Sequence, residues 1–174
     1  MWTVSEREGV QTEMTGGMSL DMDEEYVDDI DVEATQEVTA VQDRLTTATI
    51  AELNPAVPIS IDAQSSLERA TRQMNAHNIG CLLVTDAQDK LVGIFTERDV
   101  LMKVAGLVDD LSAVTVAEYM TPEPYVINGE HPIAYALHMM SVHGFRHLPL
   151  TDEEGHPTGI ISFRDVVGFL NQGM

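Results

Sequence analysis

Cysteine and long apolar runs are almost absent from this sequence. Its 174 residues include one cysteine, Cys81 in the run IGCLLV, so no disulfide can form within the chain and nothing indicates an oxidising compartment. We expect Cys81 to be a small buried hydrophobic side chain. The N-terminus has no basic segment followed by an apolar one, and no run approaches the roughly 18 apolar residues of a membrane span. These absences predict a soluble, cytoplasmic protein without membrane contact.

Basic side chains are also scarce. Nine Lys and Arg stand against 29 Asp and Glu, which gives a formal net charge of -20. Residues 1–45 hold 13 acidic and 2 basic side chains, a net of -11, and the rest holds 16 against 7, a net of -9. A field of this sign repels phosphate backbones and anionic lipid surfaces. No basic face is visible, so we expect no nucleic-acid partner.

The sequence motifs of common enzymes and metal sites are missing as well. There is no nucleophile elbow, no P-loop and no paired Cys/His signature. His138 and His143 lie five positions apart, and no cysteine or carboxylate completes a metal set with them and His147. The acidic run DMDEEYVDDID lacks the glycine and the spacing of a calcium loop. We therefore expect no catalytic residues, no metal and no required cofactor.

The N-terminal extension differs in composition from the rest of the chain. Residues 1–33 combine the acidic run DMDEEYVDDIDVE with glycine, serine and threonine, and they cannot bury enough apolar area to offset their ordering entropy. Two interpretations stay open, an acidic interaction tail and a solvated leader. The apolar spacing over residues 34–53 fits a helix that Asn54 and Pro55 would end. We expect residues 1–45 to be largely flexible, with a helix near their end.

An internal repeat organises the remaining sequence. A shift of 66 positions aligns TIAELNPAVPISI with TVAEYMTPEPYVI and GIFTERDV with GIISFRDV, without a gap. The identical pairs at this offset are Thr49/Thr115, Ala51/Ala117, Glu52/Glu118, Pro58/Pro124, Ile61/Ile127, Ala70/Ala136, Met74/Met140, His77/His143, Thr85/Thr151, Asp86/Asp152, Gly93/Gly159, Ile94/Ile160, Arg98/Arg164, Asp99/Asp165 and Val100/Val166. Fifteen shared residues over an ungapped stretch indicate a duplication.

Each repeat predicts the same order of elements, β-α-β-β-α. A short strand, VPISI or PYVIN, precedes a helix with apolar residues three or four apart, and Ser65 with Glu68 fits a capping box for the first helix. Two strands follow, CLLVT and LVGIF or HLPLT and TGIIS, and a last helix opens after Thr96 or Ser162. Neither repeat can cover its own sheet. We expect an α/β fold of two βαββα repeats, packed through their sheets with approximate twofold symmetry, and two equivalent crevices between them.

The repeated turn has a structural and a functional interpretation. In each copy a hydroxyl residue precedes the helix, an arginine follows two positions later and an aspartate three positions later. The residues are Thr96, Arg98 and Asp99, and Ser162, Arg164 and Asp165. Structurally, the hydroxyl is an N-cap and the aspartate a short capping-box partner. Functionally, the helix start, hydroxyl and arginine attract a phosphate, and an ionised carboxylate accepts hydrogen bonds from a pair of ribose hydroxyls.

On these motifs, the sequence resembles tandem cystathionine β-synthase (CBS) domains, also called a Bateman module. The resemblance covers roughly residues 46 to 172 and rests on GIFTERD and GIISFRD, on GFRHLPLTD and on AEYMTP. It implies CBS repeat 1 at residues 46–108 and CBS repeat 2 at residues 109–174. It also implies a non-catalytic regulatory module that binds AMP, ADP or ATP, forms a homodimer and acts on a separate effector protein. The alternative is a ligand-independent dimer that serves as an assembly scaffold or regulatory subunit.

The resemblance also implies a set of ligand-binding residues. The turn aspartate would bind ribose and the turn hydroxyl phosphate, which pairs Asp99 with Thr96 and Asp165 with Ser162. The base would lie in an apolar slot near the first strand and the HLP segment. The slot residues are Val57, Ile59, Ile61, Tyr125, Ile127, His147, Leu148 and Pro149.

The two crevices are not expected to be equal. Arg146 and His147 are similar to family positions that approach phosphates, whereas repeat 1 has Gly80 and Cys81 in the equivalent places. We therefore expect the crevice at Asp165 to hold an anionic nucleotide better, with Arg146, His147 and Arg164 available to it.

Overall fold

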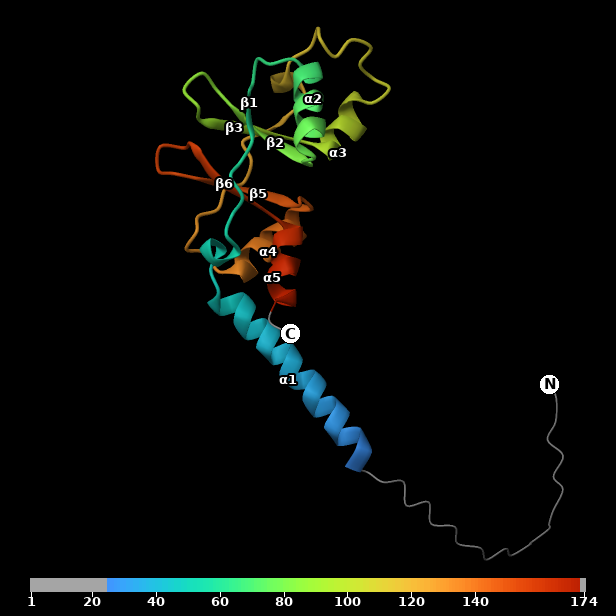
Figure 1. Cartoon of the computed structure of the whole chain (residues 1–174), viewed down its shortest axis with the longest axis vertical. Helices are drawn as coiled ribbons and strands as arrows, with labels where there is room; N and C mark the ends of the chain where they lie inside the picture. Colours follow the sequence, from blue (N-terminus) through green and yellow to red (C-terminus); the bar gives the residue numbers. More distant parts are fainter. Residues whose placement is uncertain (1–24, 173–174) are drawn as a thin grey trace, which may run out of the picture. The chain divides into compact units, whose positions relative to one another are not determined.

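The computed structural model describes the backbone of residues 25–172 and the side chains from residue 34 onward (Figure 1). Of the extension over residues 1–45 that we expected to be largely flexible, residues 1–24 lie outside the described range. The chain divides into two units, residues 1–37 and 38–174.

The elements in chain order are α1 (Glu25–Thr47), η1 (Ile50–Leu53), β1 (Ser60–Asp62), α2 (Leu67–His77), β2 (Cys81–Thr85), β3 (Leu91–Thr96), α3 (Glu97–Asp99), η2 (Val100–Val104), η3 (Val116–Glu118), β4 (Thr121–Pro122), α4 (Ile133–His143), β5 (His147–Thr151), β6 (Pro157–Ser162) and α5 (Phe163–Asn171). Among the described helices, none has the length and hydropathy needed to cross a membrane.

Helix α1 begins earlier than the sequence spacing indicates. It starts at Glu25, not near Ala34, and ends at Thr47, before the short 3-10 helix η1. The sequence contains no glycine or proline between Gly17 and Pro55, so no residue type interrupts a helical backbone there. The division between the two units falls inside this helix.

The described residues form two small sheets, one centred on each repeat. In the first sheet the strand order is β1-β2-β3-β4, with β1 parallel to β2 and the other neighbours antiparallel. In the second sheet β5 and β6 form an antiparallel hairpin. The strand expected at PYVIN is reduced there to a single parallel bridge between Ile127 and Leu150, and Ala56 pairs with Ile160.

The first part of each repeat packs on the other repeat, and we call these two parts, residues 48–56 and 114–123, the exchanged segments. This exchange is visible in pairs of backbone hydrogen bonds. The two bonds of a pair are related by a shift of 66 positions, forward for one partner and backward for the other. The pairs, donor first, are Leu67 to Val114 (3.1 Å) and Ile133 to Ala48 (3.0 Å), Val116 to Ser65 (2.9 Å) and Ile50 to His131 (2.9 Å), and Ala117 to Ala63 (2.9 Å) and Ala51 to Gly129 (3.0 Å). The halves are therefore related by an approximate twofold axis, as the duplication predicts.

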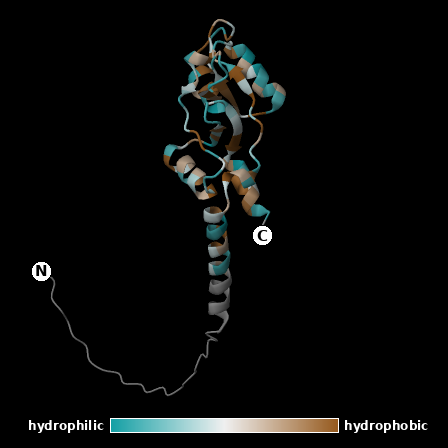
Figure 2. Cartoon of the chain, turned by 90° about the vertical axis from the view of Figure 1, so that its left-hand side faces the viewer, coloured by the Kyte–Doolittle hydropathy of each residue, from teal (hydrophilic) through white to brown (hydrophobic). Residues whose placement is uncertain are grey.

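The same exchange completes the two hydrophobic cores. Val116 is fully buried among the helix and strand residues of repeat 1, and Ile50 is fully buried in the core of repeat 2 beside Ile133 and Ile161. Each core therefore needs the exchanged segment of the other repeat. Burial of apolar surface is the main favourable term in folding, so the exchange stabilises both repeats. In Figure 2 the hydrophobic colour is visible on strands inside the folded part of the chain.

A third cluster joins the two sheets. Cys81, Leu83 and Ile94 of the first sheet are buried together, and Ile160 of β6 packs against them. The repeats therefore meet through their sheets, and Cys81 is the buried free thiol that its apolar surroundings predict.

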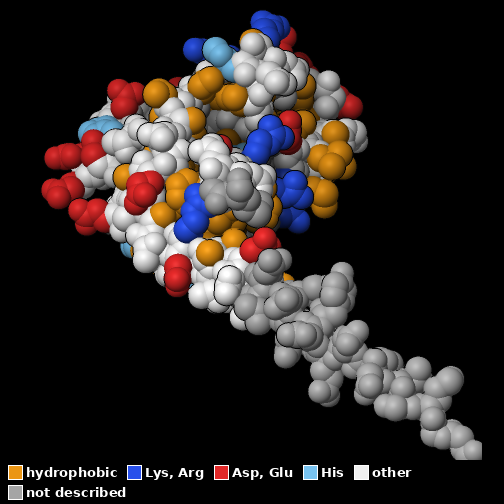
Figure 3. Space-filling model, turned by 60° about the horizontal axis from the view of Figure 1, so that its bottom comes forward, with side chains coloured by type: hydrophobic (Ala, Val, Ile, Leu, Met, Phe, Trp, Pro, Cys, Tyr) orange, Lys and Arg blue, Asp and Glu red, His pale blue; other side chains and the backbone are white. Residues whose placement is uncertain are grey.

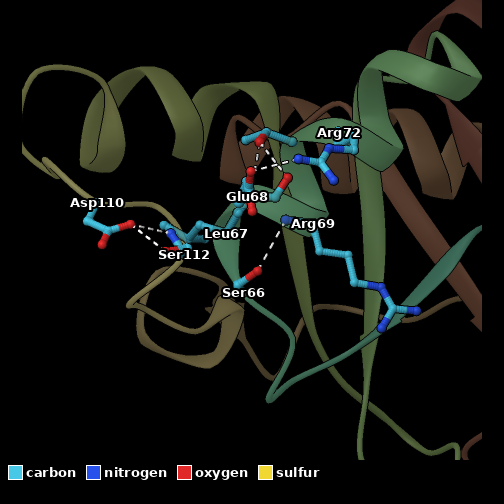
Figure 4. Close-up of polar contacts among 8 residues, drawn as sticks. Ser66, Leu67, Glu68, Arg69, Arg72, Asp110 and Ser112 are labelled. Carbon is cyan, nitrogen blue, oxygen red and sulfur yellow. Dashed lines mark hydrogen bonds and ion pairs between the residues drawn. The ribbon is translucent and has the colours of Figure 1, made fainter.

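The predicted capping box at the start of α2 is wrong by one residue. Ser66, not Ser65, is the N-cap and accepts a hydrogen bond from the Arg69 backbone N–H at 3.3 Å (Figure 4). The side chain of Glu68 forms an ion pair with Arg72 instead of reaching back. Because carbonyls of the linker between the repeats accept the first helical N–H groups, as in the Leu67 bond to Val114 O, the helix does not need a reciprocal box.

Candidate functional site

Both repeated turns form the capping box that their spacing predicts. In repeat 1, Asp99 Oδ2 accepts hydrogen bonds from Thr96 N at 2.9 Å and from Thr96 Oγ1 at 2.7 Å. In repeat 2, Asp165 Oδ2 accepts them from Ser162 N at 2.6 Å and from Ser162 Oγ at 2.8 Å. Each aspartate therefore uses one carboxylate oxygen to hold its own helix start, and the second oxygen decides what else it can bind.

The glycine of each turn is explained by the exchanged segments. A Cβ at Gly93 would collide with the side chain of Met120, and a Cβ at Gly159 would lie 3.0 Å from Cβ of Pro55. Met120 and Pro55 both belong to segments that cross from the other repeat. Glycine allows these two side chains to pack directly against the backbone of the turn.

Asp99 has no free carboxylate oxygen. Its Oδ1 contacts Lys103 Nζ at 2.7 Å and accepts a hydrogen bond from Thr121 Oγ1 at 3.2 Å. Asp99 is 6% exposed. Lys103 also donates to the carbonyls of Tyr119 at 3.0 Å and Met120 at 3.4 Å. The carboxylate is thus enclosed by groups of the chain itself.

Asp165 has a different environment. It is exposed, and none of the described residues donates a hydrogen bond to its Oδ1. The positions equivalent to Lys103 and Thr121 are Phe169 and Pro55, which carry no side-chain donor. Asp165 is therefore the turn aspartate that can still accept hydrogen bonds from a ligand.

The three predicted arginines have different roles. Arg98 donates to the carbonyl of Gly144 at 3.1 Å and so links the turn of repeat 1 to the end of α4. Arg146 and Arg164 are exposed, and neither side chain forms a hydrogen bond or ion pair with the part of the chain that the structure describes. Both side chains remain available to an anion. In the face that Figure 3 draws, acidic side chains gather at the left edge, and Lys and Arg side chains lie at the middle and at the top.

His147 lies between charged groups of both repeats. Burial lowers the pKa of its imidazole below 6.5, while the nearby carboxylates of Asp165 and Glu97 act to raise it and Arg146 acts to lower it. A Cβ at Gly80 would lie 3.2 Å from Glu97 Oε2 and 3.8 Å from His147 Cε1, so Glu97 and His147 approach the same point. His147 is therefore mainly neutral at neutral pH, a donor and acceptor beside the Asp165 turn.

The predicted apolar slot is only partly accessible. The side chains of Ile61, Ile127, Leu148 and Pro149 lie in the cores or are fully buried. Only the backbone at these four positions could face a ligand. Ile59 is half-buried against the core of repeat 1, and Val57 is 87% exposed.

Tyr125 belongs to an aromatic group on the surface of repeat 2. It is 52% exposed, and its ring stacks on His143 with centroids 4.4 Å apart. It also lies 5.7 Å from the ring of Phe145. Tyr125 is thus accessible from solvent, whereas the side chain of Ile127, predicted for the same slot, is buried in the core of repeat 2.

The two residues that enclose Asp99 were not predicted from the sequence. Lys103 lies four positions after Asp99 on the same helical segment, a spacing that favours an ion pair and could have identified it. Thr121 is 22 positions away and reaches Asp99 only because of the exchanged segment. No local pattern indicates that contact.

Two surface cavities lie near the repeated turns. One of about 290 Å³ lies between α2 and η2 and includes Glu97 and Val100 in its lining. The other, of about 410 Å³, is lined by Pro55, Thr158 and Gly159 among others. A turn aspartate lines neither of these cavities.

Three potential metal ligands meet in the β5–β6 hairpin loop. Ligand atoms of Asp152, Glu154 and His156 lie within 4.8 Å of one another. Asp152 already accepts hydrogen bonds from the backbone N–H of His156 at 2.7 Å and contacts its Nδ1 at 3.1 Å. These contacts stabilise the hairpin loop and explain why the three side chains lie close together, so we assign no metal to them.

Comparisons with known proteins agree with this architecture. The CBS domain family matches residues 50–106 and 116–172. A curated relative, an uncharacterised protein from Acidianus ambivalens, is 39% identical over 101 residues, which are 58% of this chain and 60% of that protein. The chain spans less than two thirds of the length of the curated relatives it matches.

Solved structures show the same fold. A CBS-domain-containing protein from Agrobacterium tumefaciens is 30% identical with a TM-score of 0.64, and the match covers 71% of this chain and 93% of that one. CBSX2, solved in complex with AMP, is 23% identical with a TM-score of 0.64, over 72% of this chain and 97% of that one. The duplicated turns, the exchanged segments and these matches lead to one conclusion: the chain belongs to the CBS domain family and contains a tandem pair of CBS domains.

Proposed function

We propose that this chain is a non-catalytic regulatory module that binds an adenosine-containing nucleotide of the AMP, ADP or ATP class at the Asp165 turn. The observation that carries the proposal is the open Oδ1 of Asp165, on an exposed residue beside a helix start. A pair of ribose hydroxyls can donate to this oxygen, and the phosphate can approach Arg146 or Arg164. No catalytic residue is part of the proposal.

The solved relative CBSX2 supports the ligand class, because its structure contains AMP. A site where the two repeats meet would supply the other requirement, since His147, which the charges of Asp165 and Arg146 influence, comes from one repeat and Glu97 from the other. A ligand held there contacts both repeats. It can act as a signal only if it binds one assembly or partner-bound state more tightly than another, which would then change homodimer formation or the binding of a separate effector.

The test is the binding of AMP, ADP and ATP to the full chain, measured by calorimetry and by the shift in melting temperature. We expect stabilisation that is lost in Asp165→Asn, because the amide keeps an oxygen for the Ser162 cap but presents a donor in place of the free acceptor. Glu153→Gln, which removes the same charge from an exposed loop, should bind as the unaltered chain does. The absence of heat and of stabilisation with all three nucleotides would reject the proposal.

One observation favours the alternative function, a ligand-independent dimer that serves as an assembly scaffold or regulatory subunit. Leu101, Met102 and Leu107 are 71%, 66% and 72% exposed on and just after η2. Apolar side chains grouped in this way are typical of protein–protein contacts. Light scattering that gives the mass of a dimer with and without nucleotide, unchanged in Asp165→Asn, would support the scaffold.

A further inference from the structure

The turn of repeat 1 already has the contacts that a nucleotide sugar would make. All hydrogen bonds to Asp99 Oδ2 come from Thr96, and Oδ1 is held by Lys103 Nζ at 2.7 Å and Thr121 Oγ1 at 3.2 Å. The side chain of Asp99 is only 8% exposed. A ribose hydroxyl would therefore have to displace the Lys103 ammonium or the Thr121 hydroxyl.

Lys103 is held in place by more than this ion pair. Its ammonium group also donates to the carbonyls of Tyr119 and Met120, in the segment that crosses from repeat 2. Its three donors thus meet a carboxylate and backbone oxygens, which is the full capacity of an ammonium group. Displacing Lys103 would leave Asp99 buried without a counter-charge, which is unfavourable.

The backbone under Lys103 also distinguishes repeat 1 from repeat 2. Residues 100–104 form a π-helical turn, closed by a hydrogen bond from Ala105 N to Val100 O at 2.8 Å. The equivalent part of repeat 2 is the regular helix α5. Single π-turns are rare and occur often at functional sites. Here the π-turn carries the side chain that covers Asp99.

We propose that Lys103 is a built-in occupant of the turn of repeat 1, so that each chain binds one nucleotide, at Asp165, and none at Asp99. The inference deepens the proposed function and rests on it. It explains how a duplicated turn can have one site for ligand and one that is closed by the chain itself. The difference between the two turns follows from two positions. Lys103 and Thr121 contact Asp99 in repeat 1, whereas the equivalent residues at the Asp165 turn, Phe169 and Pro55, have no side-chain donor.

The experiment counts AMP molecules per chain by calorimetry. For the unaltered full chain we expect one, falling to none in Asp165→Asn. Lys103→Met keeps the length and apolar stem of the side chain but removes the ammonium, and we expect the count to rise to two. In the double variant Asp165→Asn with Lys103→Met, one AMP should bind, at Asp99. Lys90→Met, which changes the other lysine of the chain on an exposed hairpin loop, is the matched control and should leave the count at one.

The outcomes separate this inference from the proposed function. Two AMP per unaltered chain would overturn the inference and leave nucleotide binding intact. One AMP still bound by Asp165→Asn would overturn the inference and the Asp165 site together, although the chain would still bind a nucleotide. A count that stays at one in Lys103→Met would also overturn it. If the unaltered chain binds no AMP but Lys103→Met binds one, Lys103 is confirmed as the occupant and the Asp165 site is rejected. No binding by either would reject both. A cooperative melting transition in each variant shows that it is folded.

Discussion

Arg44 lies over the ring of Phe169, with its guanidinium carbon 4.7 Å from the ring centroid. Its two terminal nitrogens donate to the carbonyls of Leu170 at 3.1 Å and Phe169 at 3.0 Å. These carbonyls belong to the last turn of α5, where backbone oxygens lack helical partners and a positive charge is favourable. The C-terminal end of α1 is thereby attached to the helix whose other end forms the Asp165 turn.

Arg44→Met removes the charge and both donors from this contact. We expect the free energy of unfolding to fall by about 1–2 kcal/mol, because two helix-end carbonyls lose a charged partner and the cation–π contact is lost. Urea denaturation followed by circular dichroism measures the change. Arg72→Met is the control, since Arg72 forms an i,i+4 ion pair with Glu68 at side chains 73% and 50% exposed and should change stability by under about 0.5 kcal/mol. Equal losses in the two variants would contradict the role of Arg44.

Gly93→Ala tests the close approach of the exchanged segment. The added methyl group meets the side chain of Met120, which must repack, so we expect a loss of about 1–3 kcal/mol in the free energy of unfolding. Gly168→Ala is the matched change in open space on α5, and there we expect a gain of about 0.5–1 kcal/mol from helix propensity. Thermal or urea unfolding gives both values. A neutral Gly93→Ala would show that Met120 is not confined.

The reactivity of Cys81 should report unfolding. Burial, with a smaller contribution from the negative charge of Glu97, raises the pKa of this thiol from 9.0 to about 12. At pH 8 the folded chain therefore has almost no thiolate, and we expect a thiol reagent to label Cys81 only as fast as the protein opens. Rapid labelling of the folded chain, at the rate of the urea-unfolded chain, would contradict the buried position.

The raised pKa of Cys81 also makes the free energy of unfolding decrease at high pH. The unfolded chain releases the Cys81 proton near pH 9.0, whereas the folded chain keeps it until about 12. The unfolded state then binds fewer protons, so the contribution of Cys81 is constant below pH 9.0 and falls as the pH rises from there toward 12. Cys81→Ala should lose this part of the pH dependence, whatever its effect on packing, and urea unfolding at pH 8 and pH 10 measures the difference.

His147 should make the protein sensitive to mild acid. Its pKa is lowered in the folded chain, chiefly by burial, so the unfolded chain takes up a proton first as the pH falls below 6.5. The stability that its neutral form provides is complete above this pH and decreases below it. We expect His147→Gln to flatten the decrease in urea unfolding between pH 7 and pH 5, and the exposed His138→Gln to leave it unchanged. An identical pH profile for the unaltered chain and His147→Gln would contradict this assignment.

The local elements could be predicted from the sequence because their signals are local. The spacing of apolar residues identified α2 and α4, and hydroxyl and aspartate three positions apart identified the capping boxes at Thr96 and Ser162. Predictions from local spacing were wrong at two places where contacts between distant segments form instead. The linker carbonyls made a capping box at Ser65 unnecessary, and the strand expected before α4 became a single bridge.

The sequence by itself determined that this chain is a duplicated pair of α/β repeats with an aspartate at each turn, because identity at one offset and short-range spacing are properties of the linear chain. Only the tertiary structure decided that the first parts of the repeats are exchanged and that the two aspartates differ. Thr121 reaches Asp99 across 22 positions, and Pro55 occupies the equivalent place at the other turn. Whether a carboxylate is enclosed or open depends on the groups that surround it in space, and most of these come from distant parts of the chain.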